Sequence, residues 1–254
     1  MGHSVLARKR LALKPAWQVT LQLVAALLVL AGCSRPEPQP LIVGEAPWQD
    51  GESSTFRVTD LNGNYAGTAR FNLARIDDQT WNLRREITAQ GTQEIVVVDL
   101  RLPDLRPTAA TLVRIDDSGA EQVRTTYNGS IADLELTNKL DITTYERVNI
   151  PSDARDQRSV LMLLRALPLA QGYATRLNSF LPIVPLLDRV TISVIAQEEV
   201  QVPAGSFDAW KVRLDTGDSR TDAWISVTPP YPLVKFIDGR TQGTFELTEF
   251  QAGS

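Results

Sequence analysis

Residues 55–76 read TFRVTDLNGNYAGTARFNLARI, two segments of alternating apolar and polar residues around Asn62-Gly63. Asn-Gly favours the tight turn of a β-hairpin because both residues readily adopt a positive φ. In the second segment the alternation is that of a strand that buries one side. The residues on one face are Tyr65, Ala69, Phe71 and Leu73. The stretch therefore predicts an antiparallel hairpin, and the same pattern continues along the chain.

Short strand-like segments separated by turn residues follow at the spacing that is typical of an all-β sheet or barrel. Residues 94–100 are apolar on both faces, which favours a strand in the middle of the sheet. Up to Ile150 the pattern predicts an antiparallel meander. Farther along the chain it predicts five more strands, over residues 189–202, 207–215, 221–226, 233–237 and 244–250.

A short helix is expected between the two β regions. Asp153 can cap it, and residues 160–167 are apolar nearly all the way round before Pro168 ends the run. A short helix without a polar face belongs inside a protein. We therefore expect a mainly β fold, a single curved antiparallel sheet with one short buried helix on its concave side. No second linker separates the β regions, so residues 48–254 are expected to form one domain.

The first 32 residues have the pattern of an export signal. They carry four bases and no acid, then an apolar stretch over residues 16–30, then small residues. The apolar stretch is shorter than the roughly 20 residues that a permanent membrane-spanning helix needs. We therefore expect residues 1–32 to be a signal peptide that is cleaved.

Cys33 is the only cysteine of the chain and follows Leu30-Ala31-Gly32. This junction resembles the bacterial lipobox, which implies that the sulfur of Cys33 receives a diacylglycerol and that the new N-terminus is acylated, for example with palmitate. The alternative is an ordinary secretory signal with Cys33 as a free thiol, which is unfavourable in an oxidising compartment. Two or three acyl chains anchor a protein stably. The resemblance thus implies a lipoprotein of the cell membrane or outer membrane, held by acylated Cys33 and facing the extracytoplasmic side.

Residues 33–47 contain four prolines among polar residues. Such a composition favours extended chain without packing partners. We predict a tether between the lipidated cysteine and the domain.

The charge of the mature chain limits its partners. All 30 acidic residues lie after residue 32, whereas four of the 26 bases lie before it, so 22 bases remain and the formal charge is −8. Nucleic-acid binding requires clustered Lys and Arg, and so does electrostatic docking to anionic lipid. We expect no nucleic-acid partner, and contact with the membrane only through the acyl chains.

The only histidine, His3, lies in the predicted signal, and the only cysteine is used for lipidation. The mature chain therefore lacks the residues for a His- or Cys-ligated zinc site, a Ser-His-Asp triad, a Cys-His pair, or the usual haem and iron–sulfur ligands. Carboxylate chemistry remains open to it. We expect no cofactor and predict that the protein is not an enzyme.

Residues 198–212 read EEVQVPAGSFDAWKV. This stretch resembles a signature of the bacterial envelope family known as domain of unknown function 3108, and residues 224–226 and 232–235 fit the closing hairpins of that family. Ser206 stands where Thr is commoner. The resemblance implies a curved β-sheet or half-barrel similar to the periplasmic lipoprotein carriers, and it implies no established activity.

Residues 180–187 are apolar, uncharged and interrupted by Pro182 and Pro185. Because proline cannot donate to a β-ladder, we expect no central strand here, and we expect the two prolines to prevent regular pairing. The segment either covers the core or forms a flap over an apolar cavity. In the second case the residues that cover an apolar ligand would come from this segment and from the helix: Phe180, Leu181, Ile183, Val184, Leu186, Leu187, Leu161 and Leu164.

Residues 215–222 hold three acids in eight positions. Their oxygens could hold calcium, but the spacing lacks the Asp-x-Asp-x-Asp-Gly pattern of calcium loops. A solvated hairpin loop is the preferred interpretation, and we predict no metal site.

Three hypotheses for function remain. The preferred one is a non-catalytic, lipid-anchored envelope protein that binds an apolar ligand or a partner protein. The second is a carboxylate-based hydrolase acting on envelope glycan, which requires two carboxyl groups about 5 to 9.5 Å apart in a cleft. The third is a purely structural lipoprotein without a cavity.

Overall fold

The computed structural model describes residues 37–254, which form one compact unit. The predicted signal peptide and Cys33 lie outside the described residues.

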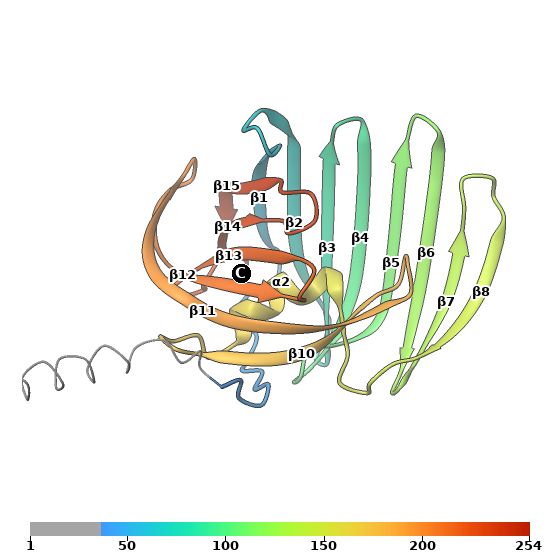
Figure 1. Ribbon diagram of the computed structural model, residues 1–254, viewed down its shortest axis with the longest axis horizontal. Coiled ribbons are helices and arrows are strands. Elements are labelled where there is room, and N and C mark those ends of the chain that lie inside the picture. Colours follow the sequence, from blue (N-terminus) through green and yellow to red (C-terminus); the bar gives the residue numbers. More distant parts are fainter. Residues whose placement is uncertain (1–36) are drawn as a thin grey trace, which may run out of the picture. The chain divides into compact units, whose positions relative to one another are not determined.

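Fifteen strands in this part of the chain form one sheet (Figure 1). They are β1 (Glu52–Thr59), β2 (Tyr65–Asp77), β3 (Thr80–Ala89), β4 (Thr92–Arg101), β5 (Arg106–Asp116), β6 (Gly119–Asn128), β7 (Ile131–Thr137), β8 (Thr143–Asn149), β9 (Arg155–Asp156), β10 (Ala174–Leu181), β11 (Leu186–Val202), β12 (Gly205–Asp215), β13 (Arg220–Ser226), β14 (Leu233–Ile237) and β15 (Thr244–Gln251). The expectation of a mainly β fold with one curved sheet is confirmed.

The order of the strands in the sheet is β8 to β1, then β15 down to β9. Each half is a meander in which consecutive strands are neighbours, and all pairs are antiparallel except the short β9–β10 pair. The two halves join where the first strand pairs with the last, with Arg57 opposite Glu246. The sheet is therefore continuous through β1 and β15 and open between β8 and β9.

The predicted hairpin of residues 55–76 forms, but its strands are joined by the five-residue loop 60–64 rather than by a tight turn at Asn62-Gly63, and Tyr65 is exposed. The amide of Asp60 donates to the carbonyl of Asn64 at 2.9 Å, and Gly63 in the turn has a φ of 82°. The inward face of the two strands enters the main core, where the rings of Phe56 and Phe71 lie 5.0 Å apart. The alternation that predicted the strands thus also fixes the face that is buried.

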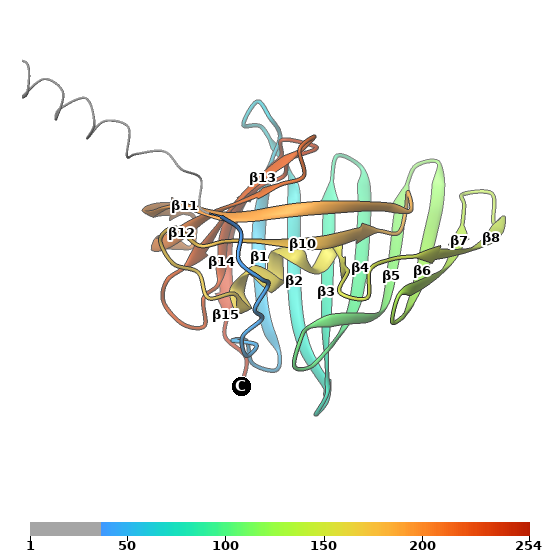
Figure 2. The same ribbon diagram turned by 60° about the horizontal axis from the view of Figure 1, so that its bottom comes forward.

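Within the described part of the chain, the one helical segment runs through η1 (Gln157–Ser159), α2 (Val160–Leu163) and η2 (Leu164–Ala166). Its residues are buried except Gln157 and the half-buried Leu161. Two views show α2 enclosed by the curved sheet (Figure 1 and Figure 2). The predicted cap at Asp153 is wrong: the cap is Asp156, three residues later, whose side chain accepts from the amide of Arg158. No helix within residues 37–254 is long and apolar enough to cross a membrane.

A buried ion pair fixes the end of the helical segment to the sheet. The guanidinium of Arg165 donates from both Nη atoms to the carboxylate of Glu52 on β1, with Nη2 3.0 Å from Oε2. The two side chains are 1% and 2% exposed. Arg165 also donates to the carbonyl oxygens of Pro230 and Tyr231 and lies over the ring of Trp48. One side chain thus connects the helix to three other parts of the fold.

The chain before β1 is not wholly an unpacked tether. The amide of Gln39 donates to the carbonyl of Ala174 at 2.8 Å, and its own carbonyl accepts from the hydroxyl of Thr175. The amide of Gly44 donates to the carbonyl of Ala166 at 2.7 Å, and a Cβ at this glycine would lie 3.0 Å from that oxygen. The expectation of extended chain without partners is therefore wrong here, because the backbone finds hydrogen-bond partners on the domain.

Replacing Glu52 by alanine should leave the buried guanidinium of Arg165 without its counter-charge. Removal of one partner from a buried ion pair costs about 3–5 kcal/mol, so we expect the free energy of unfolding in urea to fall by about this amount. The matched control is Asp133→Ala, which breaks a pair with Arg147, a side chain that is 71% exposed. The control should change the free energy of unfolding far less, and an equal loss in both variants would contradict the assigned role of the buried pair.

Candidate functional site: a cavity on the concave face of the sheet

A cavity of about 740 Å³ lies on the concave face, toward one end of the strands. Its lining includes residues from the end of β1 and the start of β2, and from the end of β3 and the start of β4. The helical segment reaches it only with its first half, residues 157–161, while its second half packs in the core. The helix is too short to fill the concavity, and the space that it leaves is the cavity.

Apolar side chains from both halves of the sheet make up much of the cavity wall. They come from the first meander, from the helix and from the second meander, and include Val58, Ile87, Leu112, Leu161, Val190 and Phe236. Ligand pockets in proteins commonly enclose roughly 300–1,000 Å³ and have mainly apolar walls. The cavity matches this class in size and in lining.

Half of the eight sequence-predicted cover residues line the cavity. These are Leu161 of the helix, Leu181 at the end of β10, and Ile183 and Val184 of the turn that follows. The helix and residues 180–187 are thus brought to one site, as the flap hypothesis expected. Whether this group covers a ligand stays a prediction.

The other four residues lie elsewhere. Phe180 is fully buried and packs edge-on against Tyr127 in a second cluster, with the ring centres 6.4 Å apart. Leu164 is fully buried in the main core. Leu186 and Leu187 open β11 and are 39% and 42% exposed.

The expectation that the two prolines prevent regular pairing in residues 180–187 is wrong. Phe180 pairs with Leu187, and Leu181 pairs with Leu186, so the segment is the tip of the β10–β11 hairpin. Pro182 and Pro185 lie in the four-residue turn, where no ladder hydrogen bond is required of their nitrogens.

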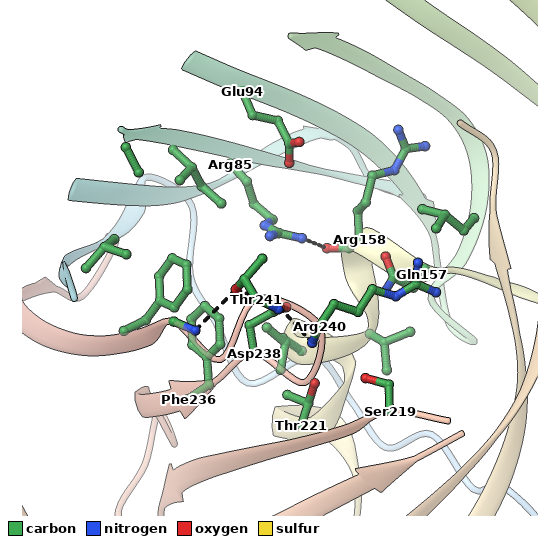
Figure 3. A pocket seen from close by; sticks show the side chains of 18 of the residues that line it. Arg85, Glu94, Gln157, Arg158, Ser219, Thr221, Phe236, Asp238, Arg240 and Thr241 are labelled. Atoms are coloured by element: carbon green, nitrogen blue, oxygen red, sulfur yellow. Dashed lines mark hydrogen bonds between the residues drawn. The ribbon is translucent and has the colours of Figure 1, made fainter. Parts of the chain in front are cut away.

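Charged side chains also line the cavity, and sequence reasoning missed them. Arg85 of β3 reaches across the cavity and donates from Nη1 to the backbone carbonyl of Arg158 at 2.7 Å (Figure 3). Its guanidinium carbon lies 4.9 Å from the ring centre of Phe71. Burial lowers the pKa of Arg85 below its ordinary value, and the nearby charge of Glu94 acts in the opposite direction. Arginine nevertheless keeps its charge in proteins.

The other arginines of the cavity take part in ion pairs. Arg114 donates to Glu94 and to Glu121, both at 2.8 Å. Arg240, on the loop after β14, lies 3.7 Å from Asp188. Within residues 37–254, no ion pair involves Arg85, although the carboxylate of Glu94 lies beside it in Figure 3.

Arg158 belongs to a buried network at the start of the helical segment. Its Nε and Nη2 donate to the two carboxylate oxygens of Asp156, at 2.8 and 2.5 Å, and the hydroxyl of Tyr127 donates to the same group at 2.6 Å. Burial by itself would raise the pKa of Asp156, but the charge and hydrogen bonds of Arg158, with the Tyr127 hydroxyl, hold that pKa below its ordinary value. Asp156 is therefore an anion that the fold keeps inside the protein.

Three polar atoms of the cavity lining are buried without a hydrogen-bond partner in the described part of the chain. They are Nε of Arg85, Nη1 of Arg158 and Oγ of Ser179. Buried polar groups in proteins are nearly always paired, so such atoms indicate a missing partner. The first two are obligate donors and the third can donate. These three atoms are therefore donors for which the described residues supply no acceptor, although carboxylates occur elsewhere in the lining.

The acidic loop of residues 215–222 is the predicted hairpin loop. It joins β12 to β13, where Arg220 lies 3.0 Å from Asp215 and Arg213 lies 2.8 Å from Asp222. Over residues 37–254 the structure shows no group of three or more His, Cys, Asp or Glu that could hold a metal ion.

An open, curved sheet with a helix and a cavity on its concave side defines the class of this protein. Residues 55–242 match the family model described as Protein of unknown function (DUF3108), so the chain belongs to that family. The resemblance at residues 198–212 is thereby confirmed. No curated protein matches the chain.

Among solved structures, a β-barrel-like protein of the domain of unknown function DUF1849 from Brucella abortus is similar in fold. It is 8% identical, with a TM-score of 0.55, and the match covers 81% of this chain and 98% of the other. A candidate lipoprotein from Parabacteroides distasonis is 14% identical over 83% of this chain and 100% of its own, with a TM-score of 0.32. The first match supports the fold and nothing beyond it. The second is too low in structural similarity to support any conclusion.

Arg85 could have been found by closer attention to the period of β3. Trp81, Leu83 and Ile87 alternate on the inward face, and Arg85 occupies the position between the last two. A strand places every second side chain on the same face. A charged residue in an inward position is a signal that the sequence itself contains.

Replacing Tyr127 by phenylalanine should make the protein more sensitive to acid. Because the native pKa of Asp156 is below its ordinary value of about 4, the stability that it contributes is present above that value and is lost as the pH falls through the native pKa. The variant loses one hydrogen bond to the carboxylate, worth about 1.5–3 kcal/mol, so its native pKa rises.

Acid unfolding followed by circular dichroism should therefore begin at a higher pH in Tyr127→Phe. The matched control is Tyr145→Phe, which changes a side chain that is 76% exposed on β8. Identical acid transitions in all three proteins would contradict the assigned network.

Proposed function

We propose that the protein is a non-catalytic binding protein of the bacterial envelope that holds an apolar ligand in the cavity on its concave face. The observation that carries this proposal is the cavity of about 740 Å³ that the short helix leaves beside apolar walls. A purely structural protein would gain stability by filling this space, since core side chains normally pack without large voids. The presence of an unfilled cavity therefore favours the binding of a ligand there.

The absence of catalysis is part of the proposal and rests on the sequence. The mature chain that follows the predicted signal contains no histidine, and its single cysteine is the predicted lipidation site. At the rim of the cavity, hydrogen bonds from Asn64 and Asn62 hold the pKa of Asp60 below its ordinary value. A general acid needs a raised pKa, so this carboxyl group is unsuited to be the general acid of the hydrolase alternative.

Lipid anchoring completes the proposal. Cys33 stands at the junction expected of a lipoprotein signal, after a basic segment and an apolar stretch. Attachment there would hold the domain at a membrane surface on the extracytoplasmic side, where amphiphilic molecules are concentrated.

Filling the cavity should reduce binding of an uncharged apolar dye such as Nile red. In Leu161→Trp the larger ring enters the space beside the helix, and in Ile87→Trp it enters from the sheet. We expect the dissociation constant of the full-length protein for the dye to rise about tenfold or more, which corresponds to about 1.4 kcal/mol. Fluorescence titration measures this change.

The matched control for these variants is Leu140→Trp, which adds the same ring at a turn residue that is 78% exposed. It should bind the dye as the parent protein does. Two variants from different walls guard against a local packing defect in either of them, and thermal unfolding checks that both are folded. Unchanged dye binding in both cavity variants would overturn the proposed site.

Replacing Cys33 by serine should abolish lipidation. In cells fed an alkyne-labelled palmitate, the parent protein should carry the label and sediment with membranes, whereas Cys33→Ser should carry none. Ser34→Ala is the control, because it changes the neighbouring residue and keeps the thiol. Unlabelled parent protein in the soluble fraction would contradict the predicted lipidation and membrane localisation.

A further inference from the structure

Resting on the proposed binding function, we propose that the ligand is an amphiphile with an anionic headgroup, a carboxylate or a phosphate, and that Arg85 binds this headgroup inside the cavity.

The first support is the bonding of Arg85. Its guanidinium carries five N–H donors, and its one hydrogen bond among the described residues goes from Nη1 to a neutral backbone carbonyl. The carboxylate of Glu94, which lies beside Arg85 in Figure 3, accepts a hydrogen bond from Arg114 at 2.8 Å. Arg85 thus lines the cavity with unused donors and a full charge.

The second support is that two further polar atoms without hydrogen-bond partners belong to residues that line the same cavity. In addition to Arg85, the wall contains Nη1 of Arg158 and Oγ of Ser179, and these two residues are only 4% and 2% exposed. They come from three elements, β3, η1 and β10, that line the same cavity. A guanidinium can donate but cannot accept, so the chemistry that satisfies two of these atoms is an acceptor. An oxyanion is the acceptor that such donors bind most strongly.

The third support is the continuity of the charged and apolar walls. Arg85, Ile87 and Ala89 are alternate residues of β3 and all line the cavity. Because alternate residues of a strand share one face, a headgroup at the first would place an attached chain along the other two. A free inorganic anion would leave this apolar surface uncovered, and a plain hydrocarbon would leave the donors unused.

Native mass spectrometry of the full-length protein in detergent tests the inference. The probes are palmitate, a palmitoyl lysophosphatidic acid and hexadecanol, whose chains have the same length and whose headgroups are a carboxylate, a phosphate ester and a neutral hydroxyl. We expect the parent protein to bind the better of the two anionic probes about tenfold more tightly than hexadecanol. The ranking of the two anionic probes identifies the headgroup class.

In Arg85→Met this preference should fall to about twofold or less, while the binding of hexadecanol stays the same. Arg85→Lys keeps a charge but loses the planar fork, so it should retain part of the preference. The matched control is Arg84→Met, on the outward face of the same strand, where Arg84 pairs with Glu86. The control should behave as the parent protein, and thermal unfolding verifies that each variant is folded.

Equal binding of all three probes by the parent protein would overturn the headgroup inference and leave the proposed apolar site in place. A preference that survives in Arg85→Met would also overturn it. If none of the probes binds and Nile red binds as well to the two cavity variants as to the parent, the proposed function itself fails.

Discussion

The position of the helical segment inside the sheet, and with it the place of the cavity, depends on the buried ion pair between Glu52 and Arg165. It fixes the end of the short helical segment against the first strand of a curved sheet. A buried pair does not by itself guarantee stability, since desolvation offsets much of the attraction. What it determines here is position. With its second half held in the core, the helix fills one end of the concave face and leaves the other end open as the cavity.

The buried polar groups also differ between the core end and the cavity end of the concave face. At the core end, the ion pair and its carbonyl partners satisfy the guanidinium of Arg165. At the cavity end, Asp156 occupies two donors of Arg158 and the hydroxyl of Tyr127, whereas Arg85 has only a carbonyl. Arg165, which is buried, thus has its hydrogen-bond partners within the protein, whereas Arg85, which is half-buried, has only one. The difference marks the cavity end as the place where something from outside the chain can complete the network.

Much of the fold could be predicted from the sequence because its signals are local. The Asn62-Gly63 turn and the alternation after it specify a hairpin, and the apolar run of residues 160–167 specifies a buried helix. The pairing of β1 with β15 could not be predicted, since no local pattern records which distant strands become neighbours. The prolines of residues 180–187 misled for a related reason: whether a proline breaks a strand depends on whether it falls within the ladder or in the turn. Only the apolar part of the site was predicted, because an uncharged apolar segment is a strong sequence signal. A single arginine at an inward position of β3 is a weak one.

The pairing of the first strand with the last affects how the domain comes into being. Residues 52–59 and 244–251 are neighbours in the sheet but are separated by most of the chain. Contacts at such separation are slow to form, because a long loop must close before they contribute. If the chain emerges N-terminus first, the edge of β1 that pairs with β15 therefore stays unpaired until this last strand is available. For a protein whose sequence predicts transport across a membrane, this delay is an advantage, since the domain cannot complete its sheet before the entire chain is present on one side.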